Sequence, residues 1–211
     1  MAHDRIVFWE VDAQADFLLP GGKLYVPGAE KIIPNLKRLV AAACRSRVLL
    51  VSSGDAHAPD DPEFQLFPPH CVKGTPGAQI VPEGLAAKRL TIPNDPWFAL
   101  PKNLLEYEQI VFEKQTLDVF DNPKADELVQ WLGPQVEYIV FGVVTEYCVR
   151  CAVKGLLERG RKAAIVGDAI ATLKPEEGTR ALSELETLGA RLISTPQAMA
   201  MAERAVALKG M

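Results

Sequence analysis

The stretch VEYIVFGVVTEYCVRCAVKGLLERG, residues 136–160, is the most informative part of the chain for the fold. Residues 136–144 are rich in β-branched and aromatic side chains, which is typical of a buried strand. Beyond Thr145 the apolar residues follow the i, i+3, i+4, i+7, i+8 spacing of an amphipathic helix: Val149, Ala152, Val153, Leu156 and Leu157. We expect Thr145 to cap this helix and Gly160 to end it.

Cys148 falls at about the third position of the predicted helix. Unpaired backbone N–H groups and the helix dipole favour a thiolate over a thiol at such a position. A thiolate is the form that attacks carbonyl carbon. Most free cysteines are instead small core residues, and this segment alone does not decide between the two interpretations.

The remaining chain alternates between strand-like and helix-like patterns. Apolar strands separated by helices indicate a parallel sheet covered on both faces. We therefore predict an α/β fold: a three-layer, doubly wound domain with a mostly parallel sheet of about six strands, formed by residues 1–211 as a single domain. The expected strands are residues 6–11, 48–53, 110–113, 138–144, 163–166 and 191–193, and the expected helices are 32–44, 124–132, 146–159, 176–188 and 197 onward.

Residues 54–105 show no clear periodicity and are rich in proline. Loops of this length within compact domains are usually functional or disordered. We find no repeats and no flexible linker.

Composition narrows the class of partner. The net charge of −4, with a pI near 5.5, argues against nucleic acid or an anionic membrane as the main partner. No apolar run approaches the roughly 20 residues of a membrane span, and the N-terminus lacks a signal-peptide layout. We expect a cytoplasmic homo-oligomer that acts on a small molecule, with its four cysteines reduced.

Polar side chains follow four of the predicted strands. Ligands of open α/β sheets bind beyond the carboxyl ends of the strands, so these side chains are expected to converge at one edge. A single polar residue at a strand end is usually just solvated, but four consecutive strands each supply a reactive or ligating group. These residues are Asp12 and Asp16, Asp55 and His57, Lys114, and Cys148.

Two of the three histidines, His57 and His70, lie in the long loop region near carboxylates. Asp55 and His57 are two residues apart, which places both side chains on one face of an extended segment. A carboxylate with two imidazoles suits Zn²⁺, Fe²⁺ or Mn²⁺. The alternative is that these residues only cap turns, where Asp and His are frequent.

The motifs VDAQADF (11–17), DAH (55–57), PPHCVKGTPGA (68–78), VFEKQT (111–116) and GVVTEYCVR (142–150) together resemble the nicotinamidase branch of the isochorismatase-like cysteine hydrolases. The resemblance covers nearly the whole chain in the right order. It implies a catalytic triad of Asp12, Lys114 and Cys148. It also implies an oxyanion hole from the backbone N–H groups of Val144 and Cys148, across a Val143–Val144 peptide that is cis in relatives.

The resemblance further implies one divalent transition metal, zinc first, held by Asp55, His57 and His70. Glu63 stands about where many members have a further histidine, and it is expected to bind the metal or a coordinated water. The implied reaction is hydrolysis of nicotinamide in NAD salvage through an acyl thioester.

The substrate is less firmly indicated than the reaction class. Phe17, Phe67, Tyr147 and Trp97 are candidates for the walls of a pocket for a planar ring, although each can equally be a core residue. Tyr147 stands where many nicotinamidases have histidine. An amidase of the same fold acting on another small amide or carbamoyl compound is therefore the alternative.

Two features bear on cofactor and reaction class. No glycine-rich phosphate cradle follows a strand, so no nucleotide cofactor is expected. The C-V-R-C spacing of Cys148 and Cys151 also fits a thioredoxin-like redox pair, but that interpretation leaves the aspartates, the lysine and the histidines unexplained.

Overall fold

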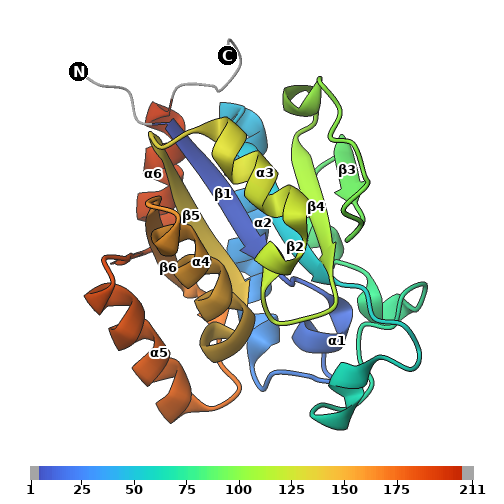
Figure 1. Cartoon of the computed structure of the whole chain (residues 1–211). Helices are drawn as coiled ribbons and strands as arrows, with labels where there is room; N and C mark the ends of the chain where they lie inside the picture. Colours follow the sequence, from blue (N-terminus) through green and yellow to red (C-terminus); the bar gives the residue numbers. More distant parts are fainter. Residues whose placement is uncertain (1–4, 206–211) are drawn as a thin grey trace.

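The computed structural model describes residues 5–205. Seven parallel strands form one sheet in the order β3-β4-β2-β1-β5-β6-β7, with helices on both faces (Figure 1). The strands are β1 (Arg5–Val11), β2 (Leu49–Asp55), β3 (Arg89–Ile92), β4 (Gln109–Lys114), β5 (Val136–Val143), β6 (Lys162–Ala171) and β7 (Arg191–Ile193).

The longer helices are α2 (Ile33–Ser46), α3 (Pro123–Leu132), α4 (Arg150–Glu158), α5 (Pro175–Thr187) and α6 (Thr195–Arg204), with a short α1 (Ala15–Leu18) after β1. Side-chain caps mark where two of them begin. Asn122 accepts from the Lys124 N–H at the start of α3, and Ser194 forms a capping box with Gln197 at the start of α6. None of the described helices is long and apolar enough to cross a membrane.

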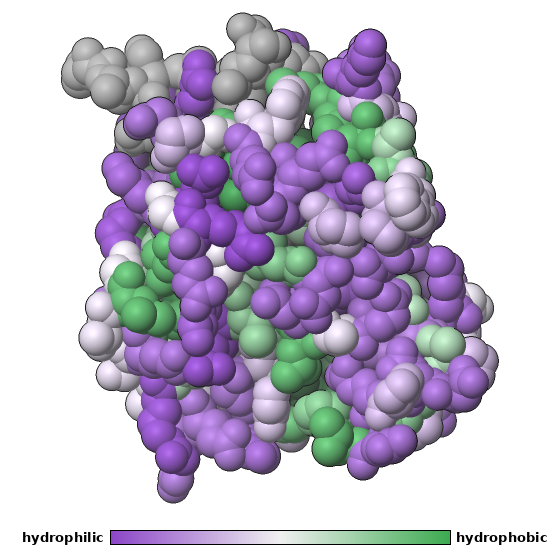
Figure 2. Space-filling view, viewed as in Figure 1, coloured by the Kyte–Doolittle hydropathy of each residue, from purple (hydrophilic) through white to green (hydrophobic). Residues whose placement is uncertain are grey.

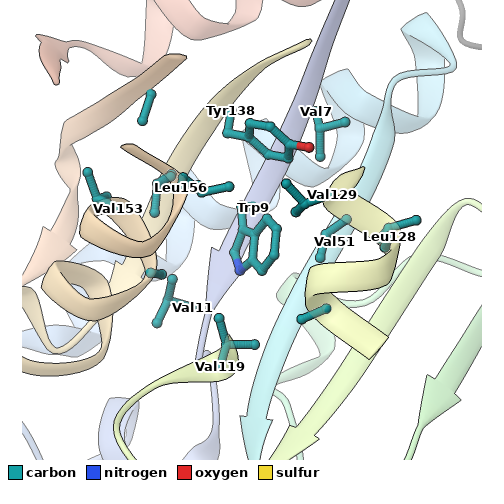
Figure 3. Packing of buried hydrophobic residues seen from close by; sticks show 14 of the residues in the cluster. Val7, Trp9, Val11, Val51, Val119, Leu128, Val129, Tyr138, Val153 and Leu156 are labelled. Atoms are coloured by element: carbon teal, nitrogen blue, oxygen red, sulfur yellow. The ribbon is translucent and has the colours of Figure 1, made fainter. Parts of the chain in front are cut away.

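The central strand β1 is buried on both faces because its side chains alternate between two cores. Val7, Trp9 and Val11 pack with α3 and α4, and Figure 3 shows Trp9 between these helices and Tyr138 of β5. Ile6 and Phe8 point the other way, into the core formed with α2 and α6. The apolar runs in the sequence are thus the centre of a three-layer sandwich, as predicted.

The sheet has one strand that sequence patterning did not predict. β3 lies within residues 54–105, where no periodicity is visible, and pairs with β4 at the edge of the sheet. It has only 4 residues, and just one of them, Ile92, is buried. A short edge strand exposes most of its side chains and so carries no burial pattern to detect.

The helix ends differ from the predictions in two places. Thr145 is not the cap of an α-helix: residues Thr145–Val149 form one π-helical turn before α4 begins at Arg150. Gly160 does follow the end of α4, with a φ of +68° that favours glycine. The helix predicted from residue 197 onward is α6, and residues 206–211 lie outside the described part of the chain, as do residues 1–4 of the predicted domain.

The strand order places a ligand crevice at one position. The connections run from β1 to β2 on one side and from β5 to β6 on the other, so the order reverses beside β1. Open α/β sheets bind ligands at the carboxyl ends of strands next to such a reversal. Most of the surface in Figure 2 is hydrophilic, and one of its several apolar patches lies at the lower end, toward which the carboxyl ends of the strands point in Figure 1.

Candidate active site

Lys114, the last residue of β4, lies at the centre of a buried charged cluster. Its Nζ is 2.9 Å from Asp12 Oδ2, 3.5 Å from Cys148 Sγ and 3.0 Å from the Thr116 carbonyl oxygen, and it also donates to Asp55 Oδ1. The side chain is 1 % exposed. Lys114 at the end of β4 therefore connects two carboxylates and a thiol that come from three other strand ends.

Asp12 is held in this cluster by backbone and side-chain contacts. It follows β1 directly and adopts a φ of +48°, an unusual conformation for a residue other than glycine. Its N–H donates to the Ser53 carbonyl at 3.2 Å, and Ser53 Oγ donates to Asp12 Oδ1 at 2.7 Å. Ser53 is a positioning residue that sequence reasoning did not identify, because the contact depends on the pairing of β1 with β2.

Burial and mutual attraction determine the ionisation of the cluster. Burial raises the pKa of the Asp12 carboxyl, and Lys114 only partly offsets this. Burial alone would lower the pKa of Lys114, but Asp12 and Asp55 together hold that pKa well above its ordinary value. Burial also acts against ionised Asp55, yet Lys114 and the neighbouring imidazoles keep its pKa well below the usual range. The cluster thus contains a permanent cation, a permanent anion and one carboxylate that readily accepts a proton.

Cys148 lies in the π-helical turn and is 5 % exposed. Burial raises the pKa of its thiol well above the ordinary value, against the opposing effect of Lys114. The prediction that the helix start by itself favours a thiolate is therefore wrong. The thiol needs a base, and Asp12 is the adjacent residue with a raised pKa.

The cis peptide expected before the π-helical turn is present between Val143 and Val144.

Asp55, His57 and His70 form a second group beside the first. Their candidate ligand atoms all lie within 4.8 Å of one another, and all three residues are buried. The Nε2 atoms of His57 and His70 lie 3.7 Å and 3.5 Å from Asp55 Oδ2, and His57 Nε2 has no hydrogen-bond partner among the described residues. Two imidazole nitrogens and a carboxylate oxygen that converge in this way fit a divalent transition metal.

Other groups orient these three side chains. His57 Nδ1 lies 3.0 Å from Asp61 Oδ2, and His70 Nδ1 lies 2.8 Å from the Pro68 carbonyl, which leaves both Nε2 atoms directed at Asp55. Gln14 binds the backbone of Asp55 on both sides, donating to its carbonyl at 2.8 Å and accepting from its N–H at 2.7 Å. Neither Asp61 nor Gln14 was predicted as a site residue, since these roles depend on tertiary contacts.

A small, mostly apolar cavity opens between the two groups. Three of the four candidate ring residues, Phe17, Phe67 and Tyr147, line it. The other lining residues are Leu24, Val26, Asp55, Glu63, His70, Leu117, Val144, Cys148 and Leu173. The rings of Phe17 and Phe67 make edge contacts with His70.

Two predicted residues lie differently from the rest. Trp97 is 88 % exposed and is not among the residues that line the cavity, so the structure does not bring it to the site. Trp97 lies in a proline-rich segment without a periodic pattern, so the sequence could not show whether its side chain lines a pocket or lies on the surface. Glu63 lines the cavity but is outside the three-residue ligand group.

Cys151 does not share the environment of Cys148. It is half-buried, it is unpaired, and burial raises the pKa of its thiol, with Asp118 adding to the effect. Redox pairs of the C-x-x-C type depend on a thiol whose pKa is lowered. The geometry therefore offers no support for the redox interpretation.

Comparison with known proteins assigns the family. The model of the isochorismatase domain matches residues 7–92 and 85–197. The chain belongs to the isochorismatase family. The match spans every strand of the sheet and all the residues of the site described above.

This member of the isochorismatase family is similar to two curated enzymes. It is 28 % identical to the nicotinamidase of Escherichia coli strain K12, with 86 % of this chain and 91 % of that protein covered. It is 26 % identical to the nicotinamidase/pyrazinamidase of Mycobacterium tuberculosis, with 87 % and 95 % covered. Among solved structures, the zinc complex of Pyrococcus horikoshii pyrazinamidase matches with a TM-score of 0.73 and 27 % identity over 90 % of this chain and 99 % of that one.

Proposed function

We propose that the protein is a metal-containing cysteine amidohydrolase whose substrate is nicotinamide. The observation that carries the proposal is the buried contact of Lys114 Nζ with Asp12, Asp55 and Cys148 at the wall of an apolar cavity. This arrangement supplies a nucleophile, a proton acceptor and a fixed positive charge within one site. Similarity to nicotinamidases over most of the chain supports the same assignment.

In the first half of the reaction, Cys148 Sγ attacks the carboxamide carbon while Asp12 takes the thiol proton. Lys114 stabilises the thiolate as it forms. The oxyanion of the tetrahedral intermediate is bound by the N–H groups of Val144 and Cys148. Asp12 then returns its proton to the amide nitrogen, the C–N bond breaks, and ammonia leaves an acyl thioester on Cys148.

In the second half, water attacks the thioester carbon while Asp12 accepts a proton from it. The C–S bond then breaks, and Asp12 returns this proton to the sulfur, which restores the thiol of Cys148 as the acid product leaves.

Asp55, His57 and His70 would hold the metal. Zinc fits this donor set, and Fe²⁺ or Mn²⁺ fit as alternatives. When bound, such an ion supplies a Lewis-acid position for a pyridine nitrogen and lowers the pKa of a coordinated water. Glu63 would bind the metal directly or accept a hydrogen bond from such a water, and its position in the lining of the same cavity as Asp55 and His70 supports this role.

The cavity favours a planar aromatic amide. Phe17, Phe67 and Tyr147 provide apolar ring surfaces between Cys148 and the ligand group, and no nucleotide enters the reaction. As part of the same proposal, the enzyme is a cytoplasmic homo-oligomer that serves NAD salvage.

Ammonia release from a panel of amides tests the proposal. Nicotinamide and pyrazinamide should be hydrolysed well, and benzamide much less, because it lacks the ring nitrogen. A clear preference for an aliphatic or carbamoyl amide would reject nicotinamide as the substrate and leave a cysteine amidase with a different pocket.

Two cysteine variants test the nucleophile in the same assay. Cys148→Ala should reduce hydrolysis by on the order of a thousandfold or more, as loss of a nucleophile does elsewhere. Cys151→Ala should retain most of the activity, since its half-buried thiol lies outside the charged cluster. Equal loss in both variants would return the redox pair to consideration.

A further inference from the structure

Glu146 is a buried acidic residue that the proposed mechanism does not use. It lies in the π-helical turn two residues before Cys148 and is 8 % exposed. Its Oε1 accepts from the N–H groups of Leu173 at 3.0 Å and Lys174 at 2.6 Å, and its Oε2 accepts from Thr172 Oγ1 at 2.6 Å. A single carboxylate therefore binds three consecutive residues that are 26 to 28 positions away in the sequence.

These three residues connect β6 to α5 and form what we call the 172–174 strap. Lys174 is the N-cap residue of α5, so Glu146 places its negative charge where the N–H groups of that helix begin. Directly before the strap, Thr145 Oγ1 of the turn donates to the carbonyl of Ala171, the last residue of β6, at 2.8 Å.

α5 also approaches the strap closely. A Cβ at Gly178 would lie 2.2 Å from Thr172 Oγ1, so only glycine permits this packing. The strap is thus held in position from two sides, by the π-helical turn and by α5.

The strap supplies one wall of the cavity through Leu173. This side chain lines the same space as Val144, Tyr147 and Cys148, which all lie in or beside the turn that carries Glu146. Without the Glu146 carboxylate, the Leu173 N–H would lose its acceptor. The contacts of the Lys174 side chain with Tyr147 and of Thr145 Oγ1 with the Ala171 carbonyl would remain, but neither involves the backbone of Leu173.

We propose that Glu146 is a positioning residue that holds Leu173 against the cavity and thereby sets the size of the group admitted next to Cys148. The inference rests on the proposed function only in taking Cys148 as the nucleophile of an amide hydrolase. Glu146 does not touch the reacting atoms. Its effect on substrate selection passes through Leu173.

The chain offers a matched set of variants. Glu146→Ala removes all three acceptor contacts. Glu146→Gln keeps one oxygen that accepts from the two N–H groups, and its NH₂ group can donate a hydrogen bond to Thr172 Oγ1. Leu173→Ala removes the wall itself. Glu177→Ala is the control, because Glu177 binds Lys174 Nζ of the strap at 3.1 Å on the surface without contacting the cavity.

The first measurement does not depend on the substrate. Alkylation of Cys148 is followed by mass spectrometry with a small reagent, iodoacetamide, and a bulkier one, N-ethylmaleimide. In Glu146→Ala and Leu173→Ala the rate ratio of bulky to small reagent should rise about tenfold, the scale on which lost pocket contacts change selectivity. Glu146→Gln and Glu177→Ala should keep the wild-type ratio.

Kinetics with the best amide of the panel provide the second measurement. Glu146→Ala and Leu173→Ala should each raise KM more than they lower kcat, and the double variant should be no worse than Leu173→Ala alone, since both act through one wall. Additive losses, or an unchanged alkylation ratio in Glu146→Ala, would overturn the proposal.

The two proposals fail in different ways. If no amide were hydrolysed, the proposed function would be rejected, while the alkylation ratios would still decide whether Glu146 and Leu173 control access to Cys148. If Glu146→Ala slowed alkylation by both reagents equally, Glu146 would act on the nucleophile itself, and the proposed role in size selection would be wrong.

Discussion

Two buried carboxyl groups at the end of β1, Glu10 within the strand and Asp12 directly after it, differ in ionisation because their neighbours differ. Asp12 and Glu10 are both 0 % exposed. Asp12 contacts Ser53 of β2 and the Lys114 ammonium of β4. Glu10 Oε2 accepts from Ser52 Oγ of β2 at 3.0 Å, and that hydroxyl in turn accepts from the neutral amide of Gln109 in β4 at 2.8 Å.

The difference lies in the partner that β4 supplies. Burial raises the pKa of Glu10 to about 8, so this side chain is neutral at pH 7. Burial is also the main cause of the raised pKa of Asp12, but the neighbouring Lys114 ammonium stabilises its charged form. The sheet therefore contains one cluster suited to proton transfer and one that is structural, and a single cation distinguishes them.

The largest effect is expected when the charged cluster loses that cation. Lys114→Met keeps the apolar stem but leaves Asp12 and Asp55 without their buried partner, which should lower stability by about 3–5 kcal/mol. Activity should fall by roughly a hundredfold to a thousandfold, as when other charge-stabilising groups are removed. Urea denaturation and ammonia release measure the two effects.

Lys73→Met is the control for the loss of a lysine. Lys73 Nζ lies 2.7 Å from Glu113 Oε2, but its side chain is 63 % exposed, so its removal should cost no more than about 1 kcal/mol. If Lys114→Met were as mild as this control, the ionic character of the Asp12 cluster would be contradicted.

The stability of the protein is expected to depend on pH through the neutral, buried Glu10. Because the pKa of Glu10 is raised to about 8 on folding, the unfolded chain ionises between about pH 4.5 and 8 while the folded protein keeps its proton. The contribution of Glu10 to stability is thus full below pH 4.5 and falls by about 1.4 kcal/mol per pH unit up to about pH 8.

Glu10→Gln removes this titration while keeping a neutral group of similar shape. As pH rises from 5 to 8, the wild type should lose this contribution and the variant should not, so the stability of the variant relative to the wild type should increase. The free energy of unfolding from urea titrations at several pH values measures the gain. A difference between the two proteins that did not change with pH would mean that Glu10 is not a neutral buried acid.

The last prediction concerns zinc binding by the candidate metal group next to the charged cluster. His57→Ala should abolish binding of about one zinc per chain, since it removes one of the three candidate ligands. Asp61→Asn should weaken zinc binding by only about 10–100-fold, because Asp61 acts through the orientation of His57. Titration of zinc against a competing chelator distinguishes the two. Equal loss in both variants would contradict the indirect role of Asp61.

The sequence by itself determined the layers of the fold and the reactive residues at the strand ends. Strands such as β1 and β5 are buried on both faces, so their apolar composition alone reveals them. The carboxyl ends of parallel strands meet at one edge, so the order of elements already brings Asp12, Asp55, Lys114 and Cys148 together. This convergence, and the grouping of two histidines with carboxylates, could be predicted without knowledge of side-chain packing.

Only the tertiary structure decided the contacts that depend on register and burial. Ser53 reaches Asp12 because Val11 pairs with Ser53, and Gln14 reaches Asp55 across 41 positions of sequence. Neither a register nor a pairing of distant residues appears in a local pattern. The exposure of Trp97, the thiol form of Cys148 and the neutrality of Glu10 likewise follow from how much water and charge surround a side chain, which depends on the whole fold.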